Sequence, residues 1–337
     1  MQHNATMDSP KQGLPHAKVT VIIVNFNGGA WLQRCVAALL EQTWPAHEII
    51  LVDNASSDGS AQAIVELFPT VRVVEAGANL GFAAGNNLAV RLAAADSDWF
   101  ALLNPDAFPE PTWLESLVDA ARNHPEYAFF GSRLMDANTP TLLDGTGDVY
   151  HTSGLVWREA HGKLLDDSLL QPKEIFSTCA AAGMYRKDVF LESGGFDEDY
   201  FCYVEDVDLG FRYRLLGHRC LYVPDSMAHH VGSAITGKRS DFSVYHGHRN
   251  LVWTYVKDMP GALFWLLLPL HLALNVLTVI YFILQGQGKV ILSAKWDAIK
   301  GLPKMWRKRA LIQSSRRATT GDIWRVLDRR LSPSRKD

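Results

Sequence analysis

Short apolar runs alternate with helix-like segments over residues 18–130. The runs are rich in β-branched residues and end in polar or glycine-containing turns, while the segments between them space their apolar residues as a helix does. Continuous apolar strands separated by helices are typical of a parallel sheet covered on both faces. We therefore expect an α/β fold with a mostly parallel sheet, whose strands cover 18–26, 48–54, 71–76, 99–104 and 127–136.

Polar side chains occupy the ends of three of these predicted strands. Asn25 lies near the end of the first, Asp53 near the end of the second, and Asp106 follows the fourth within "ALLNPDA". Pro105 stops that strand because it has no N–H to donate to the sheet. Asn, Pro and Asp are common turn residues, so an ordinary turn is the alternative interpretation. Because ligands of such sheets bind at the carboxyl ends of strands, the pattern favours a ligand contact for Asp106.

The pattern changes beyond residue 141, where loop-like stretches rich in Gly, Asp and His extend to about 250. An apolar segment at 261–284 follows, long enough to cross a bilayer. The excess of Lys and Arg after it indicates a cytosolic C-terminal flank. With the body also in the cytosol, an in-plane or re-entrant helical hairpin is favoured over one crossing. An ordinary buried helix pair is the alternative. We expect three parts: a disordered leader at 1–17, an α/β domain at 18–255, and a membrane-associating helical and basic tail at 256–337.

The net charge of -3 combines an acidic body with a basic tail. From Gln285 onward there are 14 Lys and Arg against 4 Asp and Glu. An acidic body does not suit nucleic acid, whereas the tail suits an anionic membrane surface. The four cysteines are scattered without a CxxC pair, which fits a reducing cytosol. Neither GxGxxG after the first strand nor GxxxxGK[ST] is present, so a dinucleotide dehydrogenase or a P-loop protein has little support.

An acidic cluster stands beside aromatic residues in "GGFDEDYFCYVEDVDLGFRYRLLG". Carboxylates that lie close together raise one another's pKa, which suits the cluster of Glu205, Asp206 and Asp208 to general base catalysis. Acidic residues at a helix start also favour the helix dipole, and this is the alternative for part of the cluster. Arg212 follows in the same predicted helix.

Further candidate ligand contacts lie on either side of this cluster. His229 and His230 form a pair that could bind metal or phosphate, and Arg249 could clamp a diphosphate. Upstream, "GANLGFAAGNN" places small residues at a helix start, where backbone can approach an anion closely. The glycines around 145–154 are expected to shape the side of the site that faces an acceptor.

Six motifs, in order, resemble the inverting glycosyltransferases of family 2. They are "VTVIIVNFNGGAWLQRCVAALLEQ", "VDNASSDGS", "NLGFAAGNN", "LLNPDA", "GGFDEDYF" with its "EDVDL" continuation, and "HHVGS". More narrowly, they are similar to the rhamnosyltransferase-like members that build bacterial surface polysaccharides. The resemblance covers about residues 18–255 and implies the GT-A nucleotide-sugar fold.

The resemblance also implies roles for individual residues. Asp206 would be the catalytic base, with Glu205 beside it. The metal, Mg²⁺ or Mn²⁺, would be held by Asp106 and by His230 or His229. Asn104 stands where the family's DxD pattern has its first Asp, the form usual in the rhamnosyltransferase-like branch. Taken together, the residues and the resemblance predict that the nucleotide sugar is bound by Asn25, Asn27, Asp53, Asn54, Asn79, Gly81, Asn86, Asn104, Arg212 and Arg249.

The sequence thus predicts an inverting, metal-dependent glycosyltransferase at the cytoplasmic face of a bacterial inner membrane. It would transfer a sugar, rhamnose from dTDP-rhamnose in the favoured version, to a lipid-linked glycan. The same chemistry with a UDP-sugar is the alternative within enzymes. A non-catalytic glycan-binding or scaffold protein is the alternative from another class, and the presence of both Asp106 and Asp206 disfavours it. A nucleotidyltransferase would need a lysine-containing phosphate loop near the first strand, which "NFNGGAW" lacks.

Overall fold

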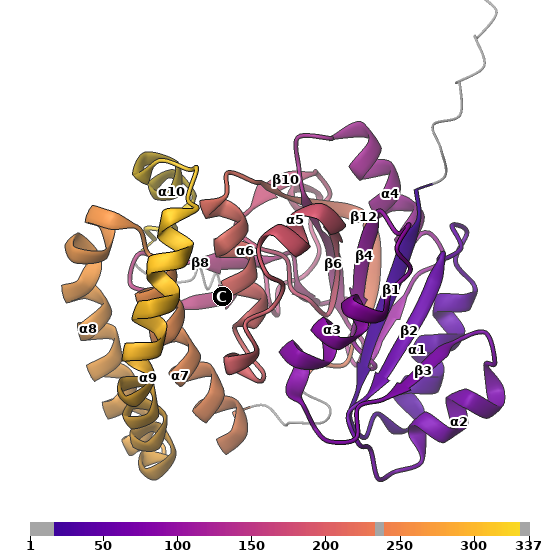
Figure 1. Cartoon of the computed structure of the whole chain (residues 1–337), viewed down its shortest axis with the longest axis horizontal. Helices are drawn as coiled ribbons and strands as arrows, with labels where there is room; N and C mark the ends of the chain where they lie inside the picture. The colour runs from indigo at the N-terminus through magenta and orange to yellow at the C-terminus, as the bar shows by residue number, and fades with distance from the viewer. Residues whose placement is uncertain (1–16, 233–238, 331–337) are drawn as a thin grey trace, which may run out of the picture.

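A computed structural model describes residues 17–232 and 239–330 of the chain. The predicted leader therefore lies outside the described residues, apart from Ala17. A mixed sheet fills the N-terminal part, and helices α7 to α10 form a separate stack beside it (Figure 1). The N-terminal elements are β1 (Val19–Asn25), α1 (Gly29–Leu40), β2 (Glu48–Asp53), α2 (Ser60–Leu67), β3 (Arg72–Glu75), α3 (Gly81–Leu92), β4 (Trp99–Leu103), β5 (Ala107–Pro109), α4 (Trp113–Asn123) and β6 (Phe129–Asp136).

The second part of the chain adds several short strands, the 11-residue strand β12 and most of the long helices. Its elements are β7 (Leu143–Gly145), β8 (Asp148–Tyr150), β9 (Val156–Arg158), β10 (Lys173–Ile175), β11 (Ala182–Arg186), α5 (Lys187–Glu192), α6 (Glu205–Leu215), β12 (Cys220–His230), α7 (Asp241–Asp258), α8 (Gly261–Leu284), α9 (Gly288–Ser314) and α10 (Thr320–Val326). The five predicted strands correspond to β1, β2, β3, β4 and β6. The loop-like region beyond 141 contains the short strands, which the apolar pattern did not predict.

The main sheet has the strand order β10-β12-β6-β11-β4-β1-β2-β3. Its first half is parallel, as predicted: β1 pairs with β2 and β4, and β2 pairs with β3. The expectation of a mostly parallel sheet is incomplete beyond β4, because β11 runs antiparallel to both β4 and β6. The sheet is therefore mixed, and the predicted α/β class is confirmed.

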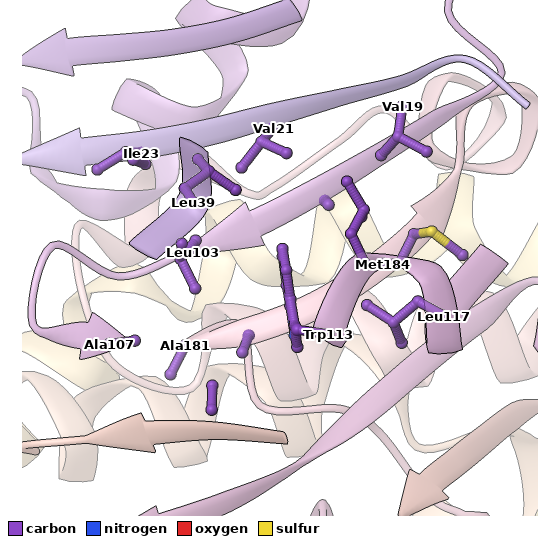
Figure 2. Close-up of a cluster of buried hydrophobic side chains, with 14 of the residues drawn as sticks. Val19, Val21, Ile23, Leu39, Leu103, Ala107, Trp113, Leu117, Ala181 and Met184 are labelled. Atoms are coloured by element: carbon purple, nitrogen blue, oxygen red, sulfur yellow. The ribbon is translucent and has the colours of Figure 1, made fainter. Parts of the chain in front are cut away.

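The apolar strands are buried on both faces, which explains their continuous apolar sequence. Alternate residues of β1 point to opposite sides: Val19, Val21 and Ile23 pack with α1 and α4, while Ile22 and Val24 pack with α3, α5 and α6. Figure 2 shows Trp113 of α4 and Met184 of β11 in the first of these cores. The helices thus cover both faces and leave the strand ends open at one edge.

The C-terminal helices form a third core around Tyr255 and Trp253 of α7. The boundary predicted at 255 falls inside α7, which continues to Asp258 and packs along α9. Among the described residues, one helix is long and apolar enough to cross a membrane by length and composition, the 24-residue α8, and most of it is exposed. One helix of this length and composition is by itself weak evidence for a membrane span.

Candidate functional site

A cleft of about 1080 Å³ opens at the carboxyl ends of the parallel strands. Its walls come from the ends of β1 and β2, the turn after β4, the start of α3, the β8–β9 hairpin, and the loop that leads into α6. Most of the residues predicted to carry chemistry line this one cavity. They are Asn54, Asn79, Gly81, Asn104, Asp106, Glu205, Asp206 and His230.

Asp106 and His230 meet on one wall of the cleft although 124 positions separate them in the sequence. Both are buried, and Asp106 Oδ1 lies 3.3 Å from His230 Nε2. The other ring nitrogen, Nδ1, lies 2.7 Å from Asp144 Oδ2. Asn104 Nδ2 lies 3.3 Å from the same Nε2 as Asp106. A hydrogen on Nδ1 bonded to Asp144 would leave Nε2 free to accept from Asn104 or to bind a metal.

Two opposing effects act on the pKa of His230. Burial lowers that pKa, but hydrogen bonds and charge interactions with Asp106 and Asp144 raise it to about 9. A divalent ion would replace the proton between His230 and Asp106. No group of three or more His, Cys, Asp and Glu side chains suited to a metal occurs in the described ranges 17–232 and 239–330. A carboxylate and an imidazole fit an ion that takes its remaining ligands from substrate phosphates and water.

His229 lies apart from this pair. Successive residues of a strand point to opposite faces, so on β12 only one of the two histidines can face the cleft. His229 Nε2 lies 3.0 Å from Glu110 Oε1, and the side chain does not line the cavity. The structure therefore brings His230 to Asp106 and does not bring His229.

Asp206 and Glu205 begin α6 at the floor of the cleft. Asp206 accepts hydrogen bonds from the backbone N–H of Ala180 (3.1 Å) and of Val207 (2.8 Å), which fix the carboxylate. Burial raises the pKa of Asp206 despite these bonds. The pKa of Glu205 is raised well above its ordinary value, by burial and then by the charge of Asp206. A buried carboxylate with a raised pKa is suited to accept a proton.

Asn25 and Asp53 lie behind the cleft rather than in it. Asn25 Nδ2 donates to Asp53 Oδ1 (2.8 Å), and to the hydroxyls of Ser56 (3.0 Å) and Ser60 (2.9 Å). Both side chains are buried and neither lines the cavity. The Asn27 side chain accepts from the Ser57 N–H instead of facing the cleft. These residues fix the strand ends, and the prediction of direct nucleotide contact has no support in the geometry.

Three other predicted binding residues have structural partners outside the cleft. Asn86 donates to the Phe82 carbonyl one turn back in α3 (2.9 Å). Arg212 is buried and bonds Asp208 and the carbonyls of Ser193 and Gly195. Arg249 donates to the carbonyls of Asp199 and Tyr200. Each of these three side chains is held by protein groups and none lines the cavity, so nucleotide-sugar binding by Asn86, Arg212 and Arg249 stays a prediction without support from the geometry.

Comparison with known proteins now identifies the family. Residues 20–193, just over half of the chain, match the model for glycosyl transferase family 2. The chain is 30% identical over 262 residues to the N-acetylglucosaminyl-diphospho-decaprenol L-rhamnosyltransferase of Mycobacterium tuberculosis, which covers 71% of this chain and 83% of the relative. The chain belongs to glycosyltransferase family 2. A second relative of this glycosyltransferase is the O-antigen biosynthesis protein RfbC of Myxococcus xanthus, 28% identical over 69% of this chain and 18% of that protein.

Solved structures support the same fold. GalNAc-T7 with UDP, GalNAc and Mn²⁺ matches with a TM-score of 0.59 at 16% identity, over 72% of this chain and 48% of that one. The mannosyltransferase PcManGT from Pyrobaculum calidifontis, in complex with GDP-Man and Mn²⁺, matches with a TM-score of 0.54 at 16% identity, over 91% and 87%. At this identity the likeness shows the fold alone, and it confirms the predicted GT-A glycosyltransferase architecture.

The glycosyltransferase site contains residues that the sequence analysis missed. Asp144, Asp148 and Arg158 all line the cleft, and Arg158 pairs with Asp144. Burial, and then the charge of Asp206, raises the pKa of Asp148 well above its ordinary value. A Cβ on Gly145 would overlap the Arg158 side chain, so this glycine lets Arg158 cross β7 to Asp144. The glycines of this region were the only sequence signal that pointed to it.

Gly81 lines the cleft and also allows close packing against Phe201. Its φ of +79° is in the left-handed region, and a Cβ there would lie 2.5 Å from the Phe201 carbonyl oxygen. That carbonyl accepts from the Ala83 N–H (3.2 Å) in the first turn of α3. Glycine therefore lets the loop before α6 close against the start of α3, which joins two walls of the site.

Proposed function

We propose that this family 2 glycosyltransferase transfers rhamnose from dTDP-rhamnose, with inversion and with a bound divalent metal, to a lipid-linked glycan of the bacterial cell surface. The observation that carries the proposal is one cleft that holds a buried Asp–His pair on one wall and a buried carboxylate base on its floor. The name of the Mycobacterium tuberculosis relative and the share of both chains that it covers support rhamnose as the transferred sugar and a lipid-linked sugar as the acceptor class.

The Asp–His pair is the proposed diphosphate end of the cleft. Asp106 and His230 would hold Mg²⁺ or Mn²⁺, which when bound supplies positive charge that stabilises the leaving nucleoside diphosphate. Asp144 orients His230 through Nδ1, and Asn104 contacts Nε2 from the strand end. Asn54, Asn79 and Gly81 line the neighbouring wall, where a nucleotide could lie close to the backbone.

Asp206 is the proposed base. A sugar hydroxyl has a high pKa, so its attack on the anomeric carbon requires a group that removes its proton. The two backbone N–H groups on Asp206 hold its carboxylate in place while a lone pair remains for the acceptor hydroxyl. One in-line displacement then inverts the anomeric centre as the bond to the diphosphate breaks.

The membrane attachment that we propose is a docking of α8 and α9 on the bilayer surface. The outer face of α8 is wholly apolar, and Leu284 is 78% exposed. A stripe of Trp296, Ile299 and Trp306 continues on α9 beside lysines. In the middle of α8, His271 Nδ1 lies 2.8 Å from the Ser153 carbonyl oxygen, so this part of the helix is held against the loop between β8 and β9. Surface docking keeps this contact, and lysines beside the stripe suit anionic lipids at the cytoplasmic face.

A panel of nucleotide sugars tests the donor. Purified enzyme with Mn²⁺ is offered dTDP-rhamnose, UDP-galactose, UDP-N-acetylglucosamine and GDP-mannose, and nucleotide release and affinity are measured. Selective response to dTDP-rhamnose is the expected result. A selective response to a UDP-sugar would replace the donor and keep the chemistry, and full activity in EDTA would overturn the metal role.

Vesicle binding tests the membrane attachment. Wild type is expected to sediment with vesicles of phosphatidylglycerol and phosphatidylethanolamine, whereas Leu266→Glu and Leu277→Glu on the outer face of α8 should remain in the supernatant. Leu67→Glu, on the exposed side of α2, is a matched control because Leu67 is also an exposed leucine at a helix. Equal sedimentation of all variants would contradict the docking.

A further inference from the structure

The loop that leads into α6 has an unusual backbone. Phe201, Tyr203 and Val204 have φ values of +63°, +69° and +70°, although none is glycine. Each such residue costs on the order of 1–3 kcal/mol and persists only where its surroundings enforce it. Strain of this kind, two residues before the proposed base Asp206, indicates that the loop places particular side chains.

Helix α7 enforces this conformation. The fully buried side chain of Asn250 donates from Nδ2 to three carbonyl oxygens of the loop, those of Tyr200 (3.0 Å), Cys202 (3.0 Å) and Tyr203 (2.7 Å). Arg249 adds bonds to the carbonyls of Asp199 (3.1 Å) and Tyr200 (2.9 Å). Side chains from α7 thus replace the regular hydrogen bonds that this loop lacks.

The strained loop and α7 together present three aromatic rings to the cleft. Phe201 and Tyr203 line the cavity, as does Phe242 from the first turn of α7. The Phe242 ring meets Phe201 at 6.1 Å and Tyr203 at 6.0 Å between centroids, edge to face. Phe242 is nevertheless 37% exposed. We call Phe201, Tyr203 and Phe242 the aromatic lip.

The aromatic lip adjoins the apolar surface of α8 and α9. Asp241, next to Phe242, accepts from Gln287 Nε2 in the turn between α8 and α9 (2.8 Å). Val244, one residue beyond Ser243, packs with Phe282 of α8 and Ile291 of α9. Figure 1 shows the start of α7 on the side of the molecule where α8 and α9 meet. A molecule anchored in a bilayer beneath these helices would reach the cleft past this lip.

We propose that the aromatic lip is the acceptor subsite, where the sugar ring of a lipid-linked acceptor stacks with a hydroxyl toward Asp206. The inference rests on the proposed function and adds the residues that select the acceptor. Pyranose rings carry apolar C–H faces, and aromatic side chains offer large flat apolar surfaces with little entropy to lose. The position directly before Glu205 and Asp206 favours the acceptor over the nucleotide base, because the acceptor hydroxyl must reach the base.

The test is steady-state kinetics of Phe242→Ala with dTDP-rhamnose and a farnesyl diphosphate-linked N-acetylglucosamine as the acceptor probe. The acceptor KM is expected to rise on the order of tenfold, while the donor KM stays within about twofold. Phe242→Tyr keeps the ring and should restore the acceptor KM. Trp31→Ala is the matched control, since Trp31 is 40% exposed on α1 and does not line the cleft.

The possible results distinguish failure of the acceptor subsite from failure of the proposed donor. An unchanged acceptor KM in Phe242→Ala would overturn the acceptor subsite. A rise in the donor KM alone would also overturn it and assign the lip to the nucleotide base. Failure of wild type to bind or use dTDP-rhamnose would overturn the proposed donor instead, before any variant is compared.

Discussion

Two regions of this glycosyltransferase hold their buried polar groups in different ways. In the parallel part of the sheet, residues 19–103, the network at the strand ends is built mainly from neutral side chains: Asn25, Ser56 and Ser60 hydrogen-bond with one another and with the carboxylates of Asp53 and Asp58. In the helical region at 193–314, the buried network is ionic. The Lys257 ammonium, with no exposed surface, lies 2.7 Å from Asp197 and also pairs with Asp208.

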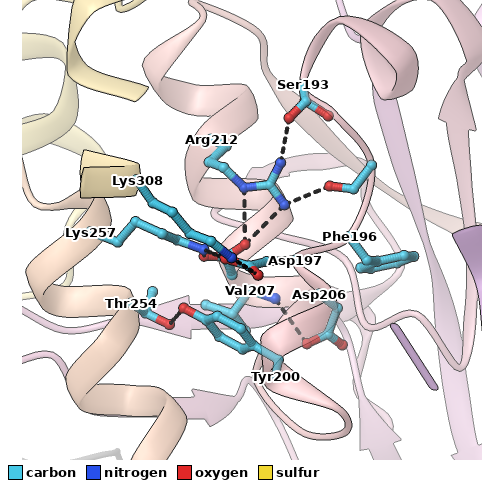
Figure 3. Close-up of polar contacts among 12 residues, drawn as sticks. Ser193, Phe196, Asp197, Tyr200, Asp206, Val207, Arg212, Thr254, Lys257 and Lys308 are labelled. Carbon is cyan, nitrogen blue, oxygen red and sulfur yellow. Dashed lines mark hydrogen bonds and ion pairs between the residues drawn. The ribbon is translucent and has the colours of Figure 1, made fainter. Parts of the chain in front are cut away.

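The ionic network joins elements that are distant in the sequence. Figure 3 shows Lys257 of α7 and Lys308 of α9 on Asp197, with Arg212 of α6 close by. Lys304 and Lys308 of α9 also pair with Asp199, at 2.6 and 2.8 Å. The network therefore ties α9, a proposed membrane-docking helix, to α6, which carries Asp206. The neutral network fixes one strand end, whereas the ionic one fixes the relative placement of three helices.

Removal of the base should have the largest effect. Asp206→Asn keeps the shape of the side chain, and its single amide oxygen can still accept one of the two N–H bonds, from Ala180 or from Val207, so binding of the nucleotide sugar should persist. The rate of transfer should fall by roughly 10²- to 10⁴-fold, the usual contribution of a positioned base. Single-turnover transfer and donor binding by calorimetry measure the two quantities separately. Loss of both would show structural damage instead of lost base catalysis.

The acid side of the pH–rate profile sharpens this prediction. Asp206 must be ionised to accept a proton, and burial raises its pKa above the ordinary 3.8. The transfer rate should therefore decline as the pH falls through this raised pKa and reach its plateau above it. In Asp206→Asn this acid limb should disappear from the residual rate. An unchanged limb in that variant would assign it to another group.

Breaking the ionic network should cost more stability than any change in the neutral one. Lys257→Met leaves Asp197 and Asp208 with less compensation for their burial, which typically costs about 3–5 kcal/mol. Urea denaturation gives the free energy of unfolding. Lys300→Met is the control, because Lys300 forms an exposed pair with Asp297 at 2.7 Å and should cost less than about 1 kcal/mol. Similar losses in the two variants would contradict the comparison.

The corresponding change in the neutral network is Asn25→Ala. It removes the donor that serves Asp53, Ser56 and Ser60 and the oxygen that accepts from the Gly28 N–H (3.1 Å). Unpaired buried polar groups of this kind cost about 1–3 kcal/mol. Asn123→Ala at the exposed end of α4 should change the free energy of unfolding by less than about 0.5 kcal/mol. A loss for Asn25→Ala as large as that for Lys257→Met would remove the distinction between the regions.

The same contrast explains which parts of the fold could be predicted from the sequence. The strands β1, β2 and β4 are continuous apolar runs, and their local pattern is sufficient to identify them. The strands β7, β8 and β9 have three residues each, too few for a period to be detected. Asp144 lies on β7, which pairs with β6, and Asp148 lies on β8, which pairs with β9. Their role was therefore missed although their glycine-rich surroundings were noticed.

The site residues also differ in how far the local sequence predicts their place. Asp106, Asp206 and His230 come from motifs whose neighbours already restrict them to strand or helix ends, and they line the cleft as predicted. Arg249 was assigned to the nucleotide because an arginine can clamp a diphosphate, and Arg212 was also predicted to bind the nucleotide sugar. The sequence does not distinguish such an arginine from one that bonds buried carbonyls, since the partners lie on other elements.

The smallest expected effect is a change in Mn²⁺ affinity, and it tests one side chain at the place where β12 meets the parallel part of the sheet. His230 on β12 faces Asp106, which follows β4, while His229 faces Glu110 on the other side of the same strand. His230→Ala should weaken Mn²⁺ binding by about tenfold or more, as expected when one of two protein ligands is removed. His229→Ala should leave it nearly unchanged. Mn²⁺ titration followed by electron paramagnetic resonance measures both without relying on activity. Equal weakening in the two variants would mean that the strand itself had been disturbed, and weakening in His229→Ala alone would transfer the metal ligand to the opposite face of β12.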